Sequence, residues 1–295
     1  MALSKNAIIG YPAGIITGIT YGLNPLFAVP LMHQGASVEG ILFFRYGIAV
    51  VLLGLFLLLR QNSFKVTLKQ AVVLLVLGVF FTLSSALLFV AYNYIASGLA
   101  TTLVFIYPAL VAIIMVFLRV VPSLPVWLSI FATFIGVMIM TYSEGDQSLD
   151  PLGIVFSLLS ALSYALFIVI IYHNKTIKEV SSTLLTFYSL TVGSFIFLAV
   201  SLSTETSLFL GINSARDYIY LLGLAIIPTI ISTATLAIAS RNIGATKASI
   251  LGVFEPITAI LVGSLIFGEP LSFNIILGIL IAVIAVTFMI VLTKR

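Results

Sequence analysis

The sequence predicts an all-α integral membrane protein whose ten transmembrane helices form two inverted five-helix repeats, with both ends of the chain inside the cell. Three observations support this prediction: the composition, an internal repeat and the distribution of charge. Of the 295 residues, 61% are hydrophobic and only 7% are charged, whereas soluble domains contain about 25% charged residues. The composition therefore excludes a soluble globular protein and indicates a protein of the lipid bilayer.

The second half of the chain repeats a proline pattern of the first half. Tyr107-Pro108 and Pro122 reappear 148 residues later as Glu255-Pro256 and Pro270, inside matching apolar context. Internal symmetry of this kind is typical of membrane proteins that are built from two structural repeats.

Small residues recur at every fourth position near the start of each half. They are Gly10, Gly14, Gly18 and Gly22 in the first half, and Gly153, Ser157, Ala161 and Ala165 in the second. Tyr21 and Tyr164 take equivalent places in these two stripes, at an offset of 143 residues. The shorter offset requires one insertion or deletion between the stripes and the prolines. We therefore expect a first repeat over residues 1–146 and a second over 147–295.

A helix needs about 20 apolar residues to span a bilayer, and the charged and turn-rich breaks in the chain leave ten such segments. The segments are 7–30, 37–59, 69–92, 97–118, 124–142, 151–172, 180–202, 217–239, 244–267 and 271–292.

Each segment of the first half has a boundary signal. The first segment follows a short basic start but is too long for an ordinary signal peptide, so we expect a retained helix. Its glycines lie on nearly one helix face and favour close packing against another backbone. The break from Pro30 to Gly35 ends this segment, and Arg60 to Lys65 separates the second from the third. The fourth and fifth segments are separated by Pro122 to Pro125.

The second half begins after the break from Ser143 to Pro151, and its first segment, 151–172, carries the second stripe of small residues. Charged residues separate 180–202 and 217–239 from their neighbours. The segment 244–267 contains Glu255-Pro256, and the last segment follows it.

The basic residues test this division, because short cytoplasmic loops retain Lys and Arg. With the N-terminus inside, eleven of the thirteen basic residues lie on the cytoplasmic side. They are Lys5, Arg60, Lys65, Lys69, Arg119, Lys175, Lys178, Arg241, Lys247, Lys294 and Arg295. Seven of the nine acidic residues fall outside or at the outer edge. Because five helices is an odd number, the second repeat is then inverted relative to the first, which suits alternating access to a site between the halves.

Several motifs resemble the drug/metabolite transporter superfamily, and the closest group is its EamA-type branch. The motifs are Phe43-Phe44-Arg45-Tyr46, Tyr107-Pro108, the run Gly244-Ala245-Thr246-Lys247-Ala248-Ser249, Glu255-Pro256 and Gly268-Glu269-Pro270. The resemblance covers nearly the whole chain, and the pattern in segment 244–267 is its most specific part. The first repeat departs from the family where it reads Leu118-Arg119-Val120-Val121-Pro122, because members often carry a glutamate there like Glu269.

The resemblance implies an exporter of amino acids or related metabolites, with a central cavity formed mainly by the first, third, fourth, sixth, eighth and ninth helices. We therefore expect a multi-pass secondary transporter of the cell (inner) membrane that works by alternating access. Its expected partners are a small-molecule substrate, the lipid bilayer and a coupling proton, and the sequence leaves its oligomeric state open. The alternative is a membrane interaction or lipid-handling protein that retains the fold without metabolite transport.

Glu255 is the first candidate site residue, because an ionised carboxylate inside a membrane segment costs several kcal/mol unless it finds a partner or a proton. Pro256 follows it and lacks the N–H of a regular helix, so we expect a kink that frees a carbonyl near Gly252. A carboxylate beside a broken helix suits a substrate ammonium group or a coupling proton. The alternative is a structural pair, or a permanently held proton, between packed helices.

Arg45 is the other ionisable residue inside a segment. It lies about 12 Å from the outer end of its helix, at about 1.5 Å per residue, which is too deep for easy snorkelling. It could bind a substrate carboxylate, pair with Glu39 or cap carbonyls of a neighbouring kinked helix. The second helix is peripheral in the resembled fold, so the sequence favours a structural role.

Further substrate-binding candidates place polar atoms at membrane depth in helices that the resemblance puts around the cavity. They are Tyr21, Asn24, Tyr107, Tyr164 and, more weakly, Ser84, Ser85, Ser232 and Thr233. Tyrosine hydroxyls can bind a solute while the rings pack its apolar part, although packing between helices is the alternative for each. Pro25 and Pro108 are further expected kinks.

Signatures of other functions are missing from the sequence. The chain has no cysteine, which excludes thiolate chemistry and cysteine-bound metals. His33 and His173 fall on opposite membrane sides in the expected topology, so they cannot share a metal or catalytic site. There is no Walker-type phosphate loop, and the basic residues are spread over short loops rather than gathered for nucleic acid. We therefore expect no enzyme activity, no cofactor, no metal and no nucleic-acid partner.

Overall fold

The computed structural model describes residues 5–61, 63–95, 97–141, 150–205, 207–267 and 272–292. The expected boundary between residues 146 and 147 and the motif Gly268-Glu269-Pro270 lie outside these ranges. Within the described ranges all regular structure is helical and no strand occurs.

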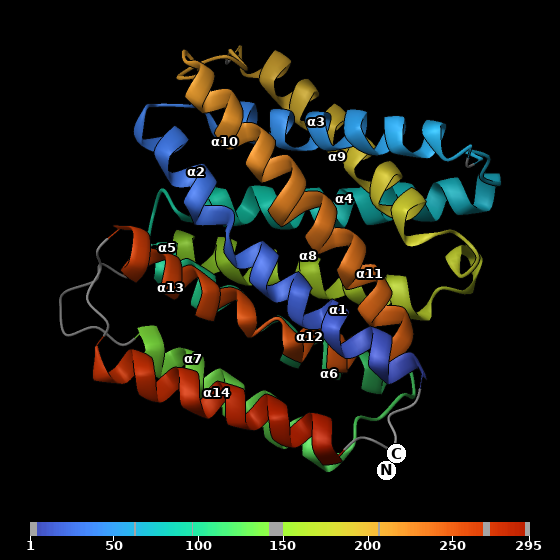
Figure 1. Cartoon of the computed structure of the whole chain (residues 1–295), viewed down its shortest axis with the longest axis vertical. Helices are drawn as coiled ribbons and strands as arrows, with labels where there is room; N and C mark the ends of the chain where they lie inside the picture. Colours follow the sequence, from blue (N-terminus) through green and yellow to red (C-terminus); the bar gives the residue numbers. More distant parts are fainter. Residues whose placement is uncertain are drawn as a thin grey trace.

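The helices follow the expected segments closely in both halves (Figure 1). The first half contains α1 (Lys5–Gly22), α2 (Asn24–His33), α3 (Val38–Leu59), α4 (Leu68–Ala91), α5 (Ser97–Val104), α6 (Tyr107–Phe117) and α7 (Leu124–Thr141). The second half contains α8 (Pro151–His173), the short 3-10 helix η1 (Lys175–Ile177), α9 (Ser182–Ser203), α10 (Ala215–Ala225), the π-helix η2 (Ile226–Ile231), α11 (Ser232–Ile243), α12 (Ala245–Leu251), α13 (Phe254–Phe267) and α14 (Phe273–Leu292).

Polar residues cap several of these helices at their N-termini. Ser37, Asp150 and Ser181 accept hydrogen bonds from backbone N–H groups in the first turns of α3, α8 and α9. Thr67 and Ser214 form capping boxes at the starts of α4 and α10. Such caps satisfy N–H groups that have no partner within the helix, so they fix where each apolar segment begins.

Eight helical stretches in the described part of the chain are long and apolar enough to cross a membrane. Two shorter apolar helices, Tyr107–Phe117 and Leu124–Ile139, accompany them. Large apolar side chains such as Leu59, Phe131 and Ile284 are exposed on the outside of the bundle. A surface of this kind suits lipid, because a helix satisfies its own backbone hydrogen bonds.

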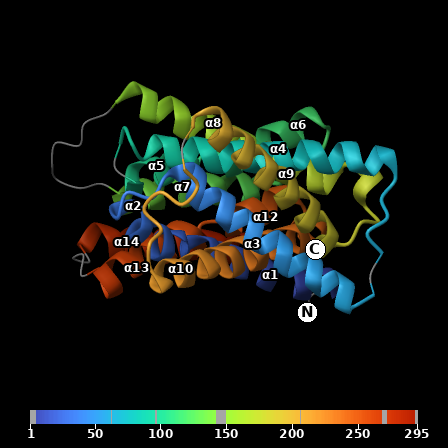
Figure 2. The same ribbon diagram turned by 90° about the horizontal axis from the view of Figure 1, so that it is seen from above.

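The helices pack as neighbouring pairs across the bundle. α7 lies against α14 along one edge and α3 lies against α9 near the opposite edge, while α1 pairs with α11 and α4 with α8 between them (Figures 1 and 2). The N-terminal end of α1 and the C-terminal end of α14 lie at the same end of the bundle (Figure 1).

The glycine stripe of α1 packs closely against other helices, at Gly18 and Gly22 against their backbones, which confirms the packing interpretation of the sequence. Gly10, Gly14, Gly18 and Gly22 face residues of α11, α12 and α13. A Cβ atom added at Gly18 would lie 2.9 Å from the carbonyl oxygen of Leu251, and one at Gly22 would overlap the carbonyl oxygen of Glu255. The missing side chains therefore let α1 approach the second half of the chain closely.

Candidate functional site

In three apolar stretches the helix is interrupted just before a two-residue motif whose second residue is proline. Leu23 separates α1 from α2 ahead of Asn24-Pro25, residues 105–106 separate α5 from α6 ahead of Tyr107-Pro108, and residues 252–253 separate α12 from α13 just ahead of Glu255-Pro256. Proline donates no backbone hydrogen bond and is therefore tolerated in the first turn of a helix, which is where Pro25 and Pro108 lie. Each interruption places a predicted site residue at the start of a new helix.

The interruptions lie next to one another at two points. Gly22, the last residue of α1, faces the backbone oxygen of Glu255. Gly252, between α12 and α13, faces the hydroxyl group of Tyr107, and any side chain at Gly252 would overlap that oxygen. The helix ends of both halves therefore converge around Glu255.

The tyrosines predicted from the sequence gather at this point. The rings of Tyr21 and Tyr164 are stacked with their centres 6.1 Å apart, and Tyr107 meets Tyr164 edge to face at 4.8 Å. Their exposed fractions are 7%, 5% and 2%, respectively, and that of Glu255 is 9%. The Glu255 carboxylate is near enough to interact electrostatically with all three hydroxyl groups. The cluster is therefore buried and contains an acid.

Arg45 adds a positively charged guanidinium group to the same cluster and is fully buried. Its Nε donates a 2.6 Å hydrogen bond to Oγ1 of Thr229, and its Nη2 donates one of 3.3 Å to the carbonyl oxygen of Pro228. Its hydrogen bonds thus go to a neighbouring irregular helix rather than to Glu39. The guanidinium carbon lies 5.6 Å from the centre of the Tyr21 ring, and Arg45 also interacts electrostatically with Glu255.

The irregular helix that receives Arg45 is the π-helix η2. Pro228 cannot donate a helical hydrogen bond, so the turn around it widens. Thr229 compensates by donating from its hydroxyl to the carbonyl oxygen of Leu224, 2.7 Å away and five residues earlier. The backbone N–H of Ser232 bonds to the carbonyl oxygens of Ile227 and Thr229, and the carbonyl oxygen of Pro228 accepts from the guanidinium group of Arg45.

Aromatic side chains that the sequence did not single out complete a closed ring of contacts with Arg45. Phe167 stacks on Tyr164 with centres 6.4 Å apart, Phe81 lies 5.0 Å from Phe167, and Tyr46 lies 5.7 Å from Phe81. Arg45 closes the ring between Tyr46 and Tyr21, at 5.7 Å and 5.6 Å. The ring joins α1, α3, α4 and α8.

The remaining predicted residues take separate positions. Oδ1 of Asn24 and Oγ1 of Thr233 are buried without a hydrogen-bond partner among the described residues. Ser85 accepts a 2.7 Å hydrogen bond from the hydroxyl group of Tyr46, so it supports the aromatic ring. Ser84 and Ser160 bond across α4 and α8. Tyr46 and the π-helix around Pro228 were not assigned to the site from the sequence. The signals that could have found them are that Tyr46 follows Arg45 directly and that Pro228 interrupts an apolar segment.

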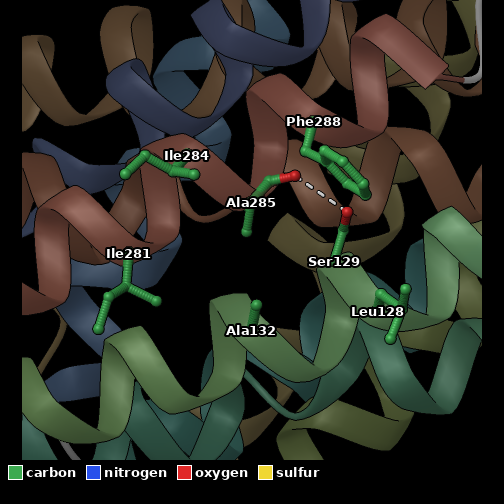
Figure 3. A pocket seen from close by; sticks show the side chains of 7 residues that line it. All are labelled: Leu128, Ser129, Ala132, Ile281, Ile284, Ala285 and Phe288. Atoms are coloured by element: carbon green, nitrogen blue, oxygen red, sulfur yellow. Dashed lines mark hydrogen bonds between the residues drawn. The ribbon is translucent and has the colours of Figure 1, made fainter.

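A second candidate site is a hollow of about 300 Å³ between α7 and α14, with no charged residue in its lining (Figure 3). It is lined by Leu128, Ser129, Ala132, Ile281, Ile284, Ala285 and Phe288. The hydroxyl group of Ser129 is used by a 2.9 Å hydrogen bond to the carbonyl oxygen of Ala285. Leu128 and Ile284 are exposed on the outside of the bundle. This hollow is apolar and offers little to a polar solute.

Comparisons with known proteins agree with the helical bundle. The EamA-like transporter family matches residues 8–142 and again residues 151–291. An uncharacterized transporter of Archaeoglobus fulgidus is 31% identical over 126 residues, which is 43% of either chain. The uncharacterized transporter YdfC of Bacillus subtilis is 25% identical over 291 residues, covering 97% of this chain and 89% of the relative. A solved structure titled "Crystal structure of protein" superposes with a TM-score of 0.76 at 16% identity, over 99% of this chain and 100% of that chain, and so shares the fold.

Proposed function

The chain belongs to the EamA-like transporter family, and from this premise we propose that it is a secondary transporter that exports amino acids or related small metabolites by alternating access. Its apolar helices require a lipid bilayer, and membership of a transporter family indicates movement of a solute rather than catalysis. We place it in the cell (inner) membrane as a multi-pass protein.

The proposed architecture has ten crossings in two inverted repeats of residues 1–146 and 147–295. In this scheme the pairs α5–α6 and α12–α13 are one interrupted crossing each, as are α1–α2 and α10–α11. The packing supports this scheme, in which α1 corresponds to α8, α3 to α9 and α4 to α10–α11. The contact of α1 with α11 corresponds to that of α8 with α4, and the contact of α3 with α10 corresponds to that of α9 with α4. Exchanging the halves thus maps the contacts onto one another. The two separate family matches point the same way.

The central cluster is the proposed substrate site, because both halves contribute to it. The first half supplies Tyr21, Arg45 and Tyr107, and the second supplies Tyr164 and Glu255. A site between two inverted repeats can be opened to either side by rocking one repeat against the other. The low exposure of these side chains corresponds to a closed conformation. Glycine contacts between α1 and α13 provide a smooth surface for such movement.

The observation that carries the proposal is a carboxylate and a guanidinium group together at the meeting point of interrupted helices. Charged groups at this depth are costly, and they mark solute and proton pathways in membrane proteins. We assign Glu255 to a substrate ammonium group or to a coupling proton. The positive end of the α13 helix dipole favours a negative charge there.

A lipid-handling or membrane interaction protein is the second candidate function. The observation that favours it is the apolar hollow between α7 and α14. The buried centre of the bundle also favours this second function, because a wet polar cavity lined by the tyrosines and Glu255 is what favours transport; a carrier has such a buried centre only in a closed state. The buried acid and guanidinium group favour transport instead, because ionisable groups at this depth mark solute and proton pathways.

Uptake into proteoliposomes tests the proposal. We would measure a panel of labelled amino acids and small metabolites, with and without an imposed pH gradient, against protein-free liposomes. Saturable flux that unlabelled solute inhibits is expected for one chemical class, and gradient dependence would assign the coupling. No flux above protein-free liposomes across the panel would contradict metabolite transport and favour the lipid-handling function.

A further inference from the structure

Arg45 retains unused hydrogen-bonding capacity inside the cluster. Two of its three guanidinium nitrogens are satisfied by the π-helix, through Thr229 and Pro228. The third, Nη1, is buried and has no hydrogen-bond partner among the described residues. An unsatisfied buried donor on a charged group costs more than a neutral one, so a partner that arrives with a ligand would recover that energy.

Among the described residues none accepts a hydrogen bond from Nη1, and on the tyrosine side the hydroxyl group of Tyr21 interacts with Arg45. On two sides lie the rings of Tyr21 and Tyr46, with centres 5.6 Å and 5.7 Å from the guanidinium carbon. The hydroxyl group of Tyr46 donates to Ser85. The two hydrogen bonds to η2 also hold the guanidinium plane in a fixed orientation, which is the preorganisation that a binding group needs.

The acid near Arg45 is Glu255, and the segment Tyr21-Gly22 contacts both residues. Tyr21 meets Arg45 through its ring, and the next residue, Gly22, lies on the backbone of Glu255. Tyr21 therefore contacts the positive group through its ring, and the residue next to it contacts the backbone of the acid, whose carboxylate interacts electrostatically with Arg45. A solute with an ammonium group at one end and a carboxylate at the other matches both charges at once.

We propose that Arg45 is the carboxylate-binding residue of this site, with Nη1 donating to the solute carboxylate while Glu255 holds its ammonium group. The assignment rests on the proposed transport function and narrows the substrate class to zwitterionic amino acids. It also revises the structural role that the sequence favoured for Arg45, since the same side chain both caps η2 and binds the solute. Guanidinium suits this task because its N–H groups match a carboxylate geometrically.

Competition for uptake by the wild-type protein gives the first test. Labelled alanine, leucine and phenylalanine would each be competed by the unlabelled amino acid, by its amide and by the acid that lacks the amino group. The amide removes the negative charge and the deaminated acid removes the positive one. We expect both analogues to inhibit at least tenfold more weakly than the amino acid, because a site built for a polar group rejects an analogue that lacks it.

The variant Arg45→Lys gives the second test. Lysine keeps the charge but removes the planar set of N–H donors. The KM for the amino acid should therefore rise about tenfold or more, and the ratio that expresses the preference for the amino acid over its amide should fall toward one. A role limited to helix packing would lower thermal stability without changing this preference. Arg216→Lys is the matched control: Arg216 is exposed, lies over the ring of Tyr220 and should leave the preference unchanged.

The outcomes distinguish failure of the role proposed for Arg45 from failure of the proposed transport function. Equal inhibition by amino acid and amide, in a protein that transports amino acids, would overturn the role of Arg45 and leave transport standing. An unchanged acid-to-amide preference in folded Arg45→Lys would do the same. The wild-type competition needs no variant, so it decides even where Arg45→Lys does not fold. Absence of saturable flux for every amino acid would overturn the transport function itself, and the assignment with it.

Discussion

Glu255 illustrates how a single residue can be held in an unfavourable place. The residue is buried, but it occupies the first turn of α13, where the helix dipole favours negative charge. The guanidinium group of Arg45 provides a further attraction. Gly22 and Gly252 allow the neighbouring backbones and the Tyr107 hydroxyl group to reach it.

The variant Glu255→Gln should lose stimulation of transport by a pH gradient and remain folded. Glutamine keeps the size and the hydrogen-bonding capacity of the side chain but cannot exchange a proton. Initial uptake rates with and without the gradient would be compared, and gel filtration would check folding. Glu39→Gln, near the start of α3, is the control and should keep its stimulation. Full stimulation in Glu255→Gln would exclude this carboxylate as the coupling group.

The variant Gly22→Ala should destabilise the protein by about 1–3 kcal/mol, the typical cost of overpacking a tight contact. The added Cβ would lie 2.7 Å from Cβ of Thr258 and would overlap the Glu255 carbonyl oxygen. Gly47→Ala is the matched control, since its Cβ would lie an ordinary 3.5 Å from Oγ of Ser194. Thermal unfolding in detergent would measure the difference. Equal melting temperatures for the two variants would contradict the close contact between α1 and α13.

The sequence was informative for the charged members of the site and less so for its aromatic frame. An arginine or a glutamate inside an apolar segment stands out, because ionisable groups at that depth need a reason. Phe81 and Phe167 carry no such signal, since the chain has 22 phenylalanines and most of them suit any lipid-embedded helix. Their membership of the ring depends on how α4 and α8 pack, which a single sequence does not reveal.

At the scale of helices, apolar length and charged breaks predicted most boundaries to within a few residues. Interruptions inside the segments were harder to place, because proline alone does not determine them. Pro12 and Pro30 lie inside α1 and α2 without separating them into further helices. The π-helix around Pro228 was not anticipated, although it supplies the acceptors for Arg45.

The variant Pro228→Ala should reduce transport at least tenfold while leaving the protein folded. Alanine restores a backbone N–H, which favours a regular α-helix, and the change of winding would move Thr229 away from Arg45. Uptake and melting temperature would be measured together. Pro12→Ala is the control, because Pro12 is exposed on a continuous helix and should leave uptake unchanged. Normal uptake by Pro228→Ala would show that the π-helix does not set the position of Arg45.

At the scale of the whole molecule, the charge pattern indicated which ends of the helices share a side, but not which helices touch. The interfaces of α7 with α14 and of α3 with α9 join segments whose order in the chain gives no hint of contact. The proposed duplication rests on prolines and small residues in the sequence, and it stays a prediction with which the mirrored helix contacts are compatible. Side-chain complementarity decides the pairing, and it becomes apparent only in three dimensions.

Labelling of single cysteines would test the proposed orientation, and the chain is well suited to it because it contains no native cysteine. On the proposed cytoplasmic side, Ser63→Cys lies in an exposed loop and Lys175→Cys at the exposed start of η1. Ser207→Cys lies in an exposed loop on the opposite side. A membrane-impermeant maleimide should label only Ser207→Cys in intact cells and all three after the membrane is opened. Labelling of Ser63→Cys in intact cells would contradict the proposed topology.

The prolines that follow Asn24, Tyr107 and Glu255 separate two tasks that most binding sites combine. The proline maintains the backbone turn, and the residue before it only presents a side chain. If these residues bind the solute as proposed, substitutions at the three positions should change solute preference while the helix starts set by the prolines are kept. A saturation library at these three positions, selected for growth on toxic metabolite analogues, would be small enough to screen completely.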